Sequence, residues 1–349
     1  MGERSAPWPR PATRRHDWPR RPAPGTPSFA CPCAGSMTSL PKHCAPSRGR
    51  RLAESWLRSI PGIREREPLA RHSWYGIGGT AEFFLELESD VPLARILPRL
   101  VAEATPVFPL GLGTNTLFRG PVLPGLTIRL ATETIQIDGQ TVAVSAGFPM
   151  PRLAAETAKA GRAGLEFGAG VPGTVGGSVF GNAGAFGTEI KDRLISADAI
   201  DPAGSVHSLT AADCQFAYRD SAFKSGPARG FIITRATFSV QPADPSAIRE
   251  RIKQVQRHRR DTQPIDKRSL GSTFKNPPGD SAGRLIEAAG LKGRRIGGAQ
   301  VSPKHANFIV NMGGATADDV LALVAEMRDA VRQRFGIELE PEIRIVGAA

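Results

Sequence analysis

The spacing of apolar residues predicts alternating strands and helices at the start of the folded part of the chain. Residues 81–87 (AEFFLEL) are typical of a strand, and residues 91–104 place Leu, Ile and Val at helical spacing, with Pro98 expected to interrupt the helix. Residues 135–144 alternate apolar and polar side chains around Asp138-Gly139, which supplies the positive φ angles of a tight turn. This segment predicts a β-hairpin, and residues 151–160 predict a short helix after it.

The same mixture continues to the C-terminus. Residues 231–240 (FIITRATFSV) predict a strand, and Pro242 and Pro245 mark a domain boundary before a basic helix at residues 248–260. Residues 316–335 predict a helix that Gly336 ends and that a strand at 338–346 follows. Thr316 can cap this helix together with Asp319, and its apolar face consists of Val320, Leu323, Val324, Met327 and Val331. Mixed elements of this kind predict the α+β class.

Composition excludes several classes of protein. A chain of 349 residues predicts two domains, and 40% hydrophobic with 22% charged residues excludes a wholly disordered protein. No run approaches the roughly 18 consecutive apolar residues of a membrane helix, and the N-terminus lacks the apolar stretch of a secretory signal. We therefore expect a soluble protein in the cytoplasm, with no membrane partner.

Residues 1–51 differ in composition from the rest of the chain. They carry ten Lys or Arg residues against two acidic ones, a net +8 of the total +12, and hold ten of the 30 prolines. With so few aliphatic side chains, this segment is expected to be disordered. It is interpreted as a nucleic-acid arm, as an organelle transit peptide, or as the result of a start site placed too early, with Met37 as the true start. We favour the last interpretation.

The cysteines predict neither a metal site nor a disulfide framework. Cys31, Cys33, His43 and Cys44 are too closely spaced, with a proline between ligands, to match a structural zinc finger. Cys214 stands alone in an aliphatic-rich domain, where it is expected to be a small buried hydrophobe.

Two glycine-rich loops are the main candidates for ligand binding. The first, residues 111–116 (GLGTNT), follows a strand-like stretch, and consecutive backbone N–H groups in such a loop can bind phosphate oxygens. Its alternative interpretation is an ordinary tight connection. The second, within the nearly uncharged residues 164–187, is not expected to form a helix or a regular strand, and contains Gly168-Ala169-Gly170-Val171-Pro172-Gly173. Because Pro172 lies inside the turn and more glycines follow, this is not a Rossmann fingerprint. The two loops, about 55 residues apart, can line both ends of one elongated ligand.

Five ordered motifs resemble the UDP-N-acetylenolpyruvoylglucosamine reductase family, the MurB-type flavoenzymes of peptidoglycan synthesis. They are residues 111–117, residues 168–187 (GAGVPGTVGGSVFGNAGAFG), Tyr218-Arg219-Asp220-Ser221, residues 271–277 (GSTFKNP) and residues 339–344 (LEPEIR). The resemblance covers roughly residues 70–347. Two departures are Thr114, where the family commonly has Ser, and a short span between Arg219 and Ser272. The latter is similar to the subclass that lacks an inserted tyrosine-bearing substrate loop.

The resemblance implies a two-subdomain FAD-binding domain of the PCMH type, like that of vanillyl-alcohol oxidase, at residues 70–241. A smaller α+β domain at residues 242–347 would bind the UDP-sugar. It further implies that NADPH reduces FAD, and that reduced FAD delivers hydride to UDP-N-acetylglucosamine enolpyruvate, giving UDP-N-acetylmuramate. The implied FAD contacts are Gly111, Gly113, Thr114, Asn115, Thr116, Gly168, Gly170, Val171, Pro172, Gly173, Thr174, Gly176, Gly177, Asn182 and Gly184.

Three residues carry over by motif to the chemical step. Ser272 would donate the proton, Arg219 would hold the substrate carboxylate and the developing enolate, and Glu342 would assist at the same enol. Each has a structural alternative. Ser272 could bond its own backbone in a turn, Arg219 could pair with Asp220 at the surface, and Glu342 could face solvent because glutamates alternate at 338, 340 and 342. Periodicity alone favours the solvent-facing position for Glu342.

Contacts to the nucleotide sugar are expected from Tyr218, Lys275, Asn276, His305 and Asn307, since Lys supplies charge for a diphosphate and Asn a paired donor and acceptor for a uracil edge. A histidine at a strand end is, alternatively, structural. The basic helix at 248–260 could steer an anionic substrate or could form a solvated face.

Two other functions remain open. An oxidase or dehydrogenase of the same fold, acting on a sugar lactone or hydroxy acid, often tethers flavin through His or Cys. Neither glycine-rich loop has such a residue, and His72 lies upstream of both, so we expect non-covalent FAD. A nucleic-acid-binding arm at residues 1–51 has only Trp8, Trp18 and Phe29 as stacking residues, so no nucleic-acid partner is expected. We also expect a monomer and no metal.

Overall fold

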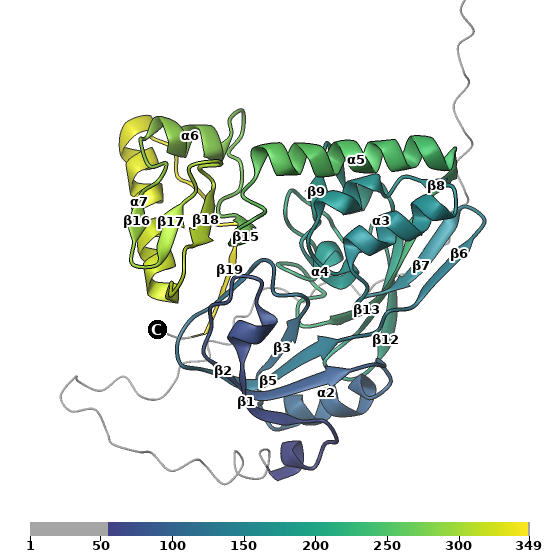
Figure 1. The fold of residues 1–349 in the computed structure, drawn as a ribbon. Helices are drawn as coiled ribbons and strands as arrows, with labels where there is room; N and C mark the ends of the chain where they lie inside the picture. The colour runs from purple at the N-terminus through teal and green to yellow at the C-terminus, as the bar shows by residue number, and fades with distance from the viewer. Residues whose placement is uncertain (1–54, 348–349) are drawn as a thin grey trace, which may run out of the picture. The chain divides into compact units, whose positions relative to one another are not determined.

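A mixed four-stranded sheet begins the part of the chain described by the structure, residues 55–347 of a computed structural model (Figure 1). The expectations for residues 1–51 lie outside the described residues. The sheet has the order β1-β2-β5-β3, in which β1 is antiparallel to β2 and the other pairs are parallel. Helix α2 (Leu93–Ala102) buries its apolar face against the sheet. The strands are β1 (Arg64–Pro68), β2 (Thr80–Leu87), β5 (Val122–Leu130) and β3 (Val107–Leu110).

A five-stranded antiparallel sheet, of order β12-β11-β13-β7-β6, follows in the chain. The helices α3 (Met150–Lys159), α4 (Val175–Phe180) and α5 (Pro245–Thr262) are grouped beside this sheet in Figure 1. Helix α5 packs against α3 and against the 3₁₀ helix Glu166–Gly170. The strands are β12 (Val206–Thr210), β11 (Leu194–Ile200), β13 (Ile232–Ser239), β7 (Thr141–Ser145) and β6 (Ile135–Asp138).

The C-terminal part has its own sheet and apolar core. The sheet has the order β15-β18-β17-β16 and is antiparallel. Helices α6 (Ala282–Ala288) and α7 (Ala317–Phe335) contribute to its core. As expected, Thr316 caps α7 in a reciprocal capping box with Asp319, and Gly336 ends it in the left-handed conformation. The strands are β15 (Arg268–Ser272), β18 (Phe308–Asn311), β17 (Ala299–Val301) and β16 (Arg295–Ile296).

Three short strand pairs complete the described elements. Strand β19 (Arg344–Val346) pairs in parallel with β4 (Thr116–Phe118), which directly follows the first glycine-rich loop. Strands β9 (Gly184–Ala185) and β10 (Thr188–Glu189) form a hairpin, and β8 (Arg162–Ala163) pairs with β14 (Gln241–Pro242). Further 3₁₀ helices are Leu69–His72 and Ile190–Asp192.

Two expected local structures were wrong. Helix α2 continues through Pro98, because its buried leucines and isoleucine hold both turns against the sheet. The glycine-rich second loop contains a helix, α4. A Cβ added to Gly176 would lie 2.9 Å from the Cβ of Ala146, so glycine there permits close packing of a helix. Thr174 caps α4 by accepting a hydrogen bond from the backbone N–H of Gly177.

The predicted strand at residues 338–346 is shorter than expected, since only Arg344–Val346 form β19. The residues before β19 pair with the end of β15 and the residues after it: the Lys275 N–H donates to the Glu340 carbonyl at 2.9 Å, and the Glu342 N–H to the Thr273 carbonyl at 2.8 Å. Cys214 is buried, as expected.

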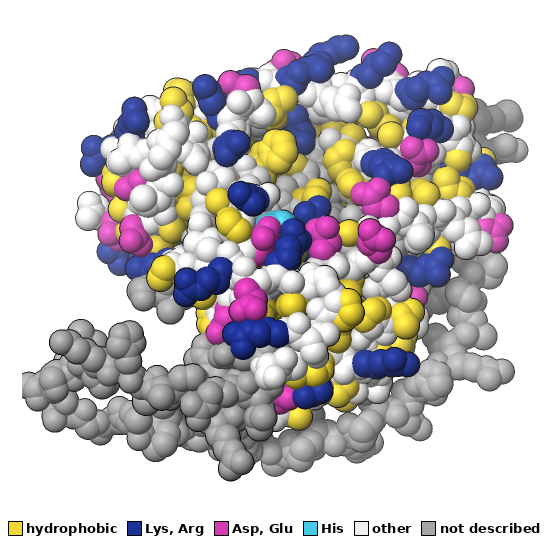
Figure 2. Space-filling view, turned by 60° about the horizontal axis from the view of Figure 1, so that its bottom comes forward, with side chains coloured by type: hydrophobic (Ala, Val, Ile, Leu, Met, Phe, Trp, Pro, Cys, Tyr) yellow, Lys and Arg dark blue, Asp and Glu magenta, His cyan; other side chains and the backbone are white. Residues whose placement is uncertain are grey.

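Charged side chains are interspersed on the face drawn in Figure 2, where Lys and Arg alternate with Asp and Glu over the described residues. Within residues 55–347, no helix is both long and apolar enough to cross a membrane.

Candidate active site

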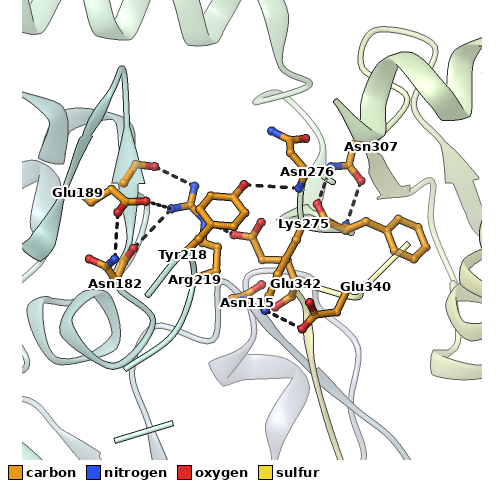
Figure 3. A network of polar contacts seen from close by, with 12 residues as sticks. Asn115, Asn182, Glu189, Tyr218, Arg219, Lys275, Asn276, Asn307, Glu340 and Glu342 are labelled. Atoms are coloured by element: carbon orange, nitrogen blue, oxygen red, sulfur yellow. Dashed lines mark hydrogen bonds and ion pairs between the residues drawn. The ribbon is translucent and has the colours of Figure 1, made fainter. Parts of the chain in front are cut away.

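An ion pair between Arg219 and Glu342 joins the segment before β13 to the segment before β19. The Arg219 Nε donates to Glu342 Oε1 at 2.9 Å, although the residues are 123 positions apart (Figure 3). The two side chains are only 21% and 19% exposed. Because water is largely excluded, the Coulomb attraction between the two groups is screened less than in an ion pair at the surface. The surface pair of Arg219 with Asp220 is replaced by this long-range contact, since Asp220 instead accepts from the Ser221 N–H and the Ser225 hydroxyl.

Strand pairing brings Glu342 to the first glycine-rich loop. Directly after Glu342, β19 adds in parallel to β4, and the Arg344 N–H donates to the Asn115 carbonyl at 2.9 Å. The Asn115 side-chain amide in turn donates to the Glu342 carbonyl at 3.1 Å. The chain therefore carries Glu342 from the C-terminal core back to the loop at residues 111–116, and does not leave it on a solvent-facing strand.

The backbone of Arg219 is held in a strained conformation. Its φ angle is +56°, which residues other than glycine rarely adopt. Its guanidinium donates to the carbonyls of Asn182 and Gly184 at 3.4 and 3.2 Å, while Lys224 Nζ donates to the Arg219 carbonyl at 2.7 Å. The surrounding hydrogen bonds thus fix both the backbone and the side chain of this arginine.

Glu189 forms a second acidic partner for Arg219. Its carboxylate lies 3.7 Å from Arg219 Nη1 and accepts from the Asn182 amide at 3.0 Å. Asn182 is fully buried, and its amide also donates to the Ala217 carbonyl and accepts from the Lys191 N–H. Asn182 therefore positions Glu189 through its side chain and Arg219 through its carbonyl, and its expected contact with a cofactor stays a prediction.

Burial shifts the acid–base properties of this cluster. Burial raises the pKa of Glu342 above its usual range, and the neighbouring Arg219 opposes that shift. Burial, with Lys275 nearby, lowers the pKa of Lys224. Two groups close to Arg219 are thus moved toward neutrality, which suits a site where protons are transferred.

Ser272 ends β15, one residue from the segment that pairs with Glu342. The Thr273 N–H donates to the Asn307 carbonyl at 2.7 Å, and the Thr273 carbonyl accepts from the Glu342 N–H. Within residues 55–347, the Ser272 hydroxyl makes no hydrogen bond, so the turn bond to its own backbone is not formed. Its proton is free to be donated to a ligand.

The two glycine-rich loops lie against each other, as a single elongated ligand requires. A Cβ on Gly111 would lie 2.8 Å from Thr174 Oγ1, and a Cβ on Gly173 would lie 3.5 Å from Thr114 Oγ1. Side chains at these glycines would fill the space between the loops. The arrangement fits a dinucleotide whose phosphates contact backbone N–H groups. The remaining residues expected at the cofactor lie in β4 (Thr116), in the 3₁₀ helix (Gly168, Gly170), just after it (Val171, Pro172), in α4 (Gly176, Gly177), and at β9 (Gly184).

His72 lies close to the first loop, but its ring points into the protein core. Its carbonyl lies against Gly113, whereas its ring stacks on Phe84 at 4.2 Å and forms a 2.8 Å contact with Glu67. The imidazole, 9% exposed, is therefore engaged away from the loop.

Tyr218, Lys275 and Asn276 lie together beside the ion pair (Figure 3). The Tyr218 hydroxyl accepts from the Asn276 N–H at 3.4 Å, and the Arg219 guanidinium lies over the Tyr218 ring at 5.2 Å. Lys275 pairs with the largely exposed Glu340 at 2.6 Å. These polar groups from two domains form one side of the site.

Asn307 and His305 are held by the protein itself. The Asn307 amide accepts from the Phe274 N–H at 2.9 Å and donates to the Phe274 carbonyl at 2.8 Å, and Asn307 is 2% exposed. The His305 ring packs edge-on against Phe308 at 4.7 Å, its Nδ1 accepts from the Asn307 N–H, and burial lowers its pKa. Asn307 thus fixes the segment that carries Ser272 and Lys275, and the expected substrate contacts of Asn307 and His305 stay predictions.

Sequence reasoning missed Glu189 and Lys224. Lys224 follows the Tyr218–Ser221 motif by three residues, and Glu189 follows the second glycine-rich segment by two. Their proximity to those motifs was the available signal, but only the fold shows that both contact Arg219. Among residues 55–347, no group of three or more His, Cys, Asp or Glu side chains is placed to hold a metal ion.

Comparisons with known proteins agree with this geometry. Residues 263–346 match the model of the UDP-N-acetylenolpyruvoylglucosamine reductase C-terminal domain, and residues 81–210 match an FAD-binding domain. The chain is 44% identical to UDP-N-acetylenolpyruvoylglucosamine reductase 2 of Symbiobacterium thermophilum over 297 residues, 83% of this chain and 96% of that protein. It is also 44% identical to the reductase of Rubrobacter xylanophilus, over 83% of this chain and 97% of that protein.

A solved structure with the same fold is UDP-N-acetylenolpyruvylglucosamine reductase (MurB) from Thermus caldophilus. Its TM-score is 0.71 at 37% sequence identity, covering 82% of this chain and all of that chain. The expected fold, an FAD-binding domain followed by a separate α+β domain, is confirmed.

Proposed function

Because the chain belongs to the UDP-N-acetylenolpyruvoylglucosamine reductase family, we infer that it reduces UDP-N-acetylglucosamine enolpyruvate to UDP-N-acetylmuramate in peptidoglycan synthesis, with FAD as cofactor and NADPH as reductant. The observation that carries the proposal is the Arg219–Glu342 ion pair, formed between two domains beside the glycine-rich loops. Residues 70–241 would hold the cofactor, and residues 242–347 would contribute the substrate-binding domain.

Bound FAD supplies a carrier that accepts hydride from NADPH and passes it to the enolpyruvyl double bond. The two apposed loops would hold it, with backbone N–H groups of residues 111–116 at the pyrophosphate and residues 168–184 along its other half. The buried and engaged ring of His72 supports non-covalent binding, since neither loop itself contains His or Cys.

Arg219 would bind the substrate carboxylate and stabilise the enolate that develops during hydride addition. A guanidinium stays charged and matches a carboxylate with two parallel hydrogen bonds. The fixed backbone and the anchoring carbonyls support this role, because a preorganised charge need not reorient in the transition state.

Ser272 would donate the proton that completes the reduction. Its hydroxyl, which makes no hydrogen bond within the described residues, follows Gly271, so a substrate can approach it closely. A hydroxyl is a weak acid, and the positive charge of Lys275, three residues further along the chain, would favour its transient alkoxide.

Glu342 would assist at the same enol of the substrate. Burial raises its pKa, which favours a carboxyl group that can share a proton, and its contact with Arg219 would tie its position to the substrate carboxylate. Tyr218, Lys275, Asn276, His305 and Asn307 would bind the diphosphate and sugar, and Asn307 would also fix that segment.

We further propose that the enzyme acts as a monomer in the cytoplasm. Its proposed substrates are two anionic nucleotides.

An anaerobic two-step experiment tests the function. The FAD-loaded protein is bleached with NADPH, and UDP-N-acetylglucosamine enolpyruvate is then added while the flavin spectrum is followed. Reoxidation by the UDP-sugar, with UDP-N-acetylmuramate as product, is the expected result. A flavin that recovers only with oxygen would contradict the proposal and favour an oxidase.

The role of Ser272 is tested in the same experiment. Ser272→Ala should leave bleaching by NADPH unchanged and slow reoxidation by about 10²- to 10⁴-fold, the usual contribution of a positioned proton donor. Ser281→Ala, which removes a capping hydroxyl from the same domain, is the matched control and should reoxidise at the wild-type rate. Equal rates in the two variants would exclude Ser272 as the donor.

A further inference from the structure

A cleft of about 570 Å³ lies between α5 and the 3₁₀ helix Glu166–Gly170. Its lining includes Glu166, Phe186, Arg193, Arg251 and His258. None of the proposed catalytic residues lines it. The cleft is therefore distinct from the site formed around Arg219.

Glu166 and Arg193, two lining residues of opposite charge, each have one buried polar atom without a hydrogen bond. In the described part of the chain, Glu166 Oε1 and Arg193 Nε are both buried without a hydrogen bond, and the two side chains form no ion pair with each other. Both flank Gly164: its N–H donates to Glu166 Oε2 at 2.8 Å, and a Cβ added to it would lie 3.4 Å from Arg193 Nε. Buried polar atoms of native proteins nearly always have partners, so this pair needs an explanation.

Helix α5 adds a second basic group to the cleft. Arg251, Val255 and His258 lie at positions i, i+4 and i+7, so they share one helix face. Opposite them, Phe186 is 50% exposed, has φ of +56°, and meets the His258 ring edge-on at 5.2 Å. The cleft thus combines two arginines, one carboxylate and an exposed aromatic ring.

We propose that this cleft binds a small zwitterion of the acidic amino-acid class. Arg193 binds the α-carboxylate, Glu166 binds the ammonium group, and Arg251 binds a second carboxylate. A simple anion would be repelled by the carboxylate of Glu166, and a simple cation would be repelled by the guanidinium of Arg193. A carboxylate and an ammonium on one small molecule satisfy both groups together.

The β9–β10 hairpin contributes to both sites. Phe186 and Thr188 line the cleft, while the Gly184 carbonyl and Glu189 contact Arg219. A ligand in the cleft would therefore contact the same hairpin that positions the proposed catalytic arginine.

Isothermal titration of the FAD-loaded protein with L-glutamate tests the proposal. We expect saturable binding, with glutarate, which lacks the ammonium group, at least about tenfold weaker. Glu166→Gln keeps an oxygen for the Gly164 N–H and should remove the preference for L-glutamate over glutarate. Arg193→Gln should weaken binding of both. Arg95→Gln, an exposed arginine on α2, is the control and should bind as wild type does.

Arg251→Gln provides a test that does not perturb the buried part of the cleft, because Arg251 is exposed on α5. It should weaken L-glutamate binding to the level of L-glutamine, while L-glutamine binding stays unchanged. Absence of L-glutamate binding to the wild-type protein, or an undiminished preference for L-glutamate over glutarate in Glu166→Gln, would overturn the proposal.

Discussion

Gly113 lies where the first glycine-rich loop approaches the chain at residues 72–73, and Gly113→Ala should test the loop's proposed role. Its φ angle is +60°, and an added Cβ would lie 2.2 Å from the His72 carbonyl oxygen and 2.9 Å from Ser73 Cα. Both obstacles are backbone atoms, so the methyl group cannot be accommodated by a side-chain rotation. The loop itself would have to move away from its neighbour.

Gly139 offers a matched control for this substitution. It has a similar φ of +54° in the turn of the β6–β7 hairpin, but an added Cβ would have no atom within 4 Å. Gly139→Ala should therefore cost only the left-handed conformation, about 1–2 kcal/mol. Gly113→Ala should cost the same plus about 1–3 kcal/mol for overpacking, or about 2–5 kcal/mol in total. The entropy lost by the unfolded chain is common to both and cancels in the difference.

Urea unfolding of the two apoproteins measures this difference in the free energy of unfolding, and quenching of flavin fluorescence measures FAD affinity. Gly113→Ala should also bind FAD at least about tenfold more weakly, because its loop N–H groups are displaced, whereas Gly139→Ala should bind it normally. Equal losses of stability, or an unchanged FAD affinity in Gly113→Ala, would refute the close-approach argument and the assignment of this loop to the cofactor.

Three other predictions address the site and its supports. Burial raises the folded-state pKa of Glu342, so the stability contributed by its neutral form is present below the unfolded pKa and is lost as the pH rises through the folded pKa. The Tm of the wild-type protein should therefore fall more with rising pH than the Tm of Glu342→Gln. Parallel curves of Tm against pH would contradict this. Lys224→Met removes the hydrogen bond to the Arg219 carbonyl and should lower kcat/KM for the UDP-sugar at least about tenfold. The rate of flavin reduction by NADPH should not change. Stopped-flow spectroscopy can measure flavin reduction and flavin reoxidation separately. Burial raises the pKa of the Cys214 thiol to about 12. In a variant without the three N-terminal cysteines, a thiol reagent should therefore react only when the protein unfolds. Rapid labelling of the native protein would argue against this.

Local patterns predicted the elements whose determinants are local. The β6–β7 hairpin follows from Asp138-Gly139, and α7 follows from a cap, a periodic apolar face and a terminal glycine. The glycines at 164–187 predicted no helix, because small residues serve two purposes. They let a loop approach a ligand, and they let α4 pack closely against Ala146.

The candidate site depended on contacts that no local pattern contains. Alternation of glutamates predicted a solvent-facing Glu342, but the strand is interrupted before β19 and its preceding residues pair with the segment after Ser272. Both ends of the Asn307 amide bond the backbone of Phe274, 33 positions away, a contact that no local pattern contains, and the expected contact of Asn307 with the ligand stays a prediction. Family motifs supplied Arg219 and Glu342, and the fold added Glu189 and Lys224.

The pairing of β19 with β4 has a consequence for the order of folding. Asn115 and Glu342, which it brings together, are 227 positions apart, so this contact closes a very long loop and carries a large entropic cost until the C-terminal core has docked. The four- and five-stranded sheets contain the glycine-rich loops and can form before that event. Until that contact forms, Arg219 lacks Glu342, so the proposed site would be complete only in the fully folded chain.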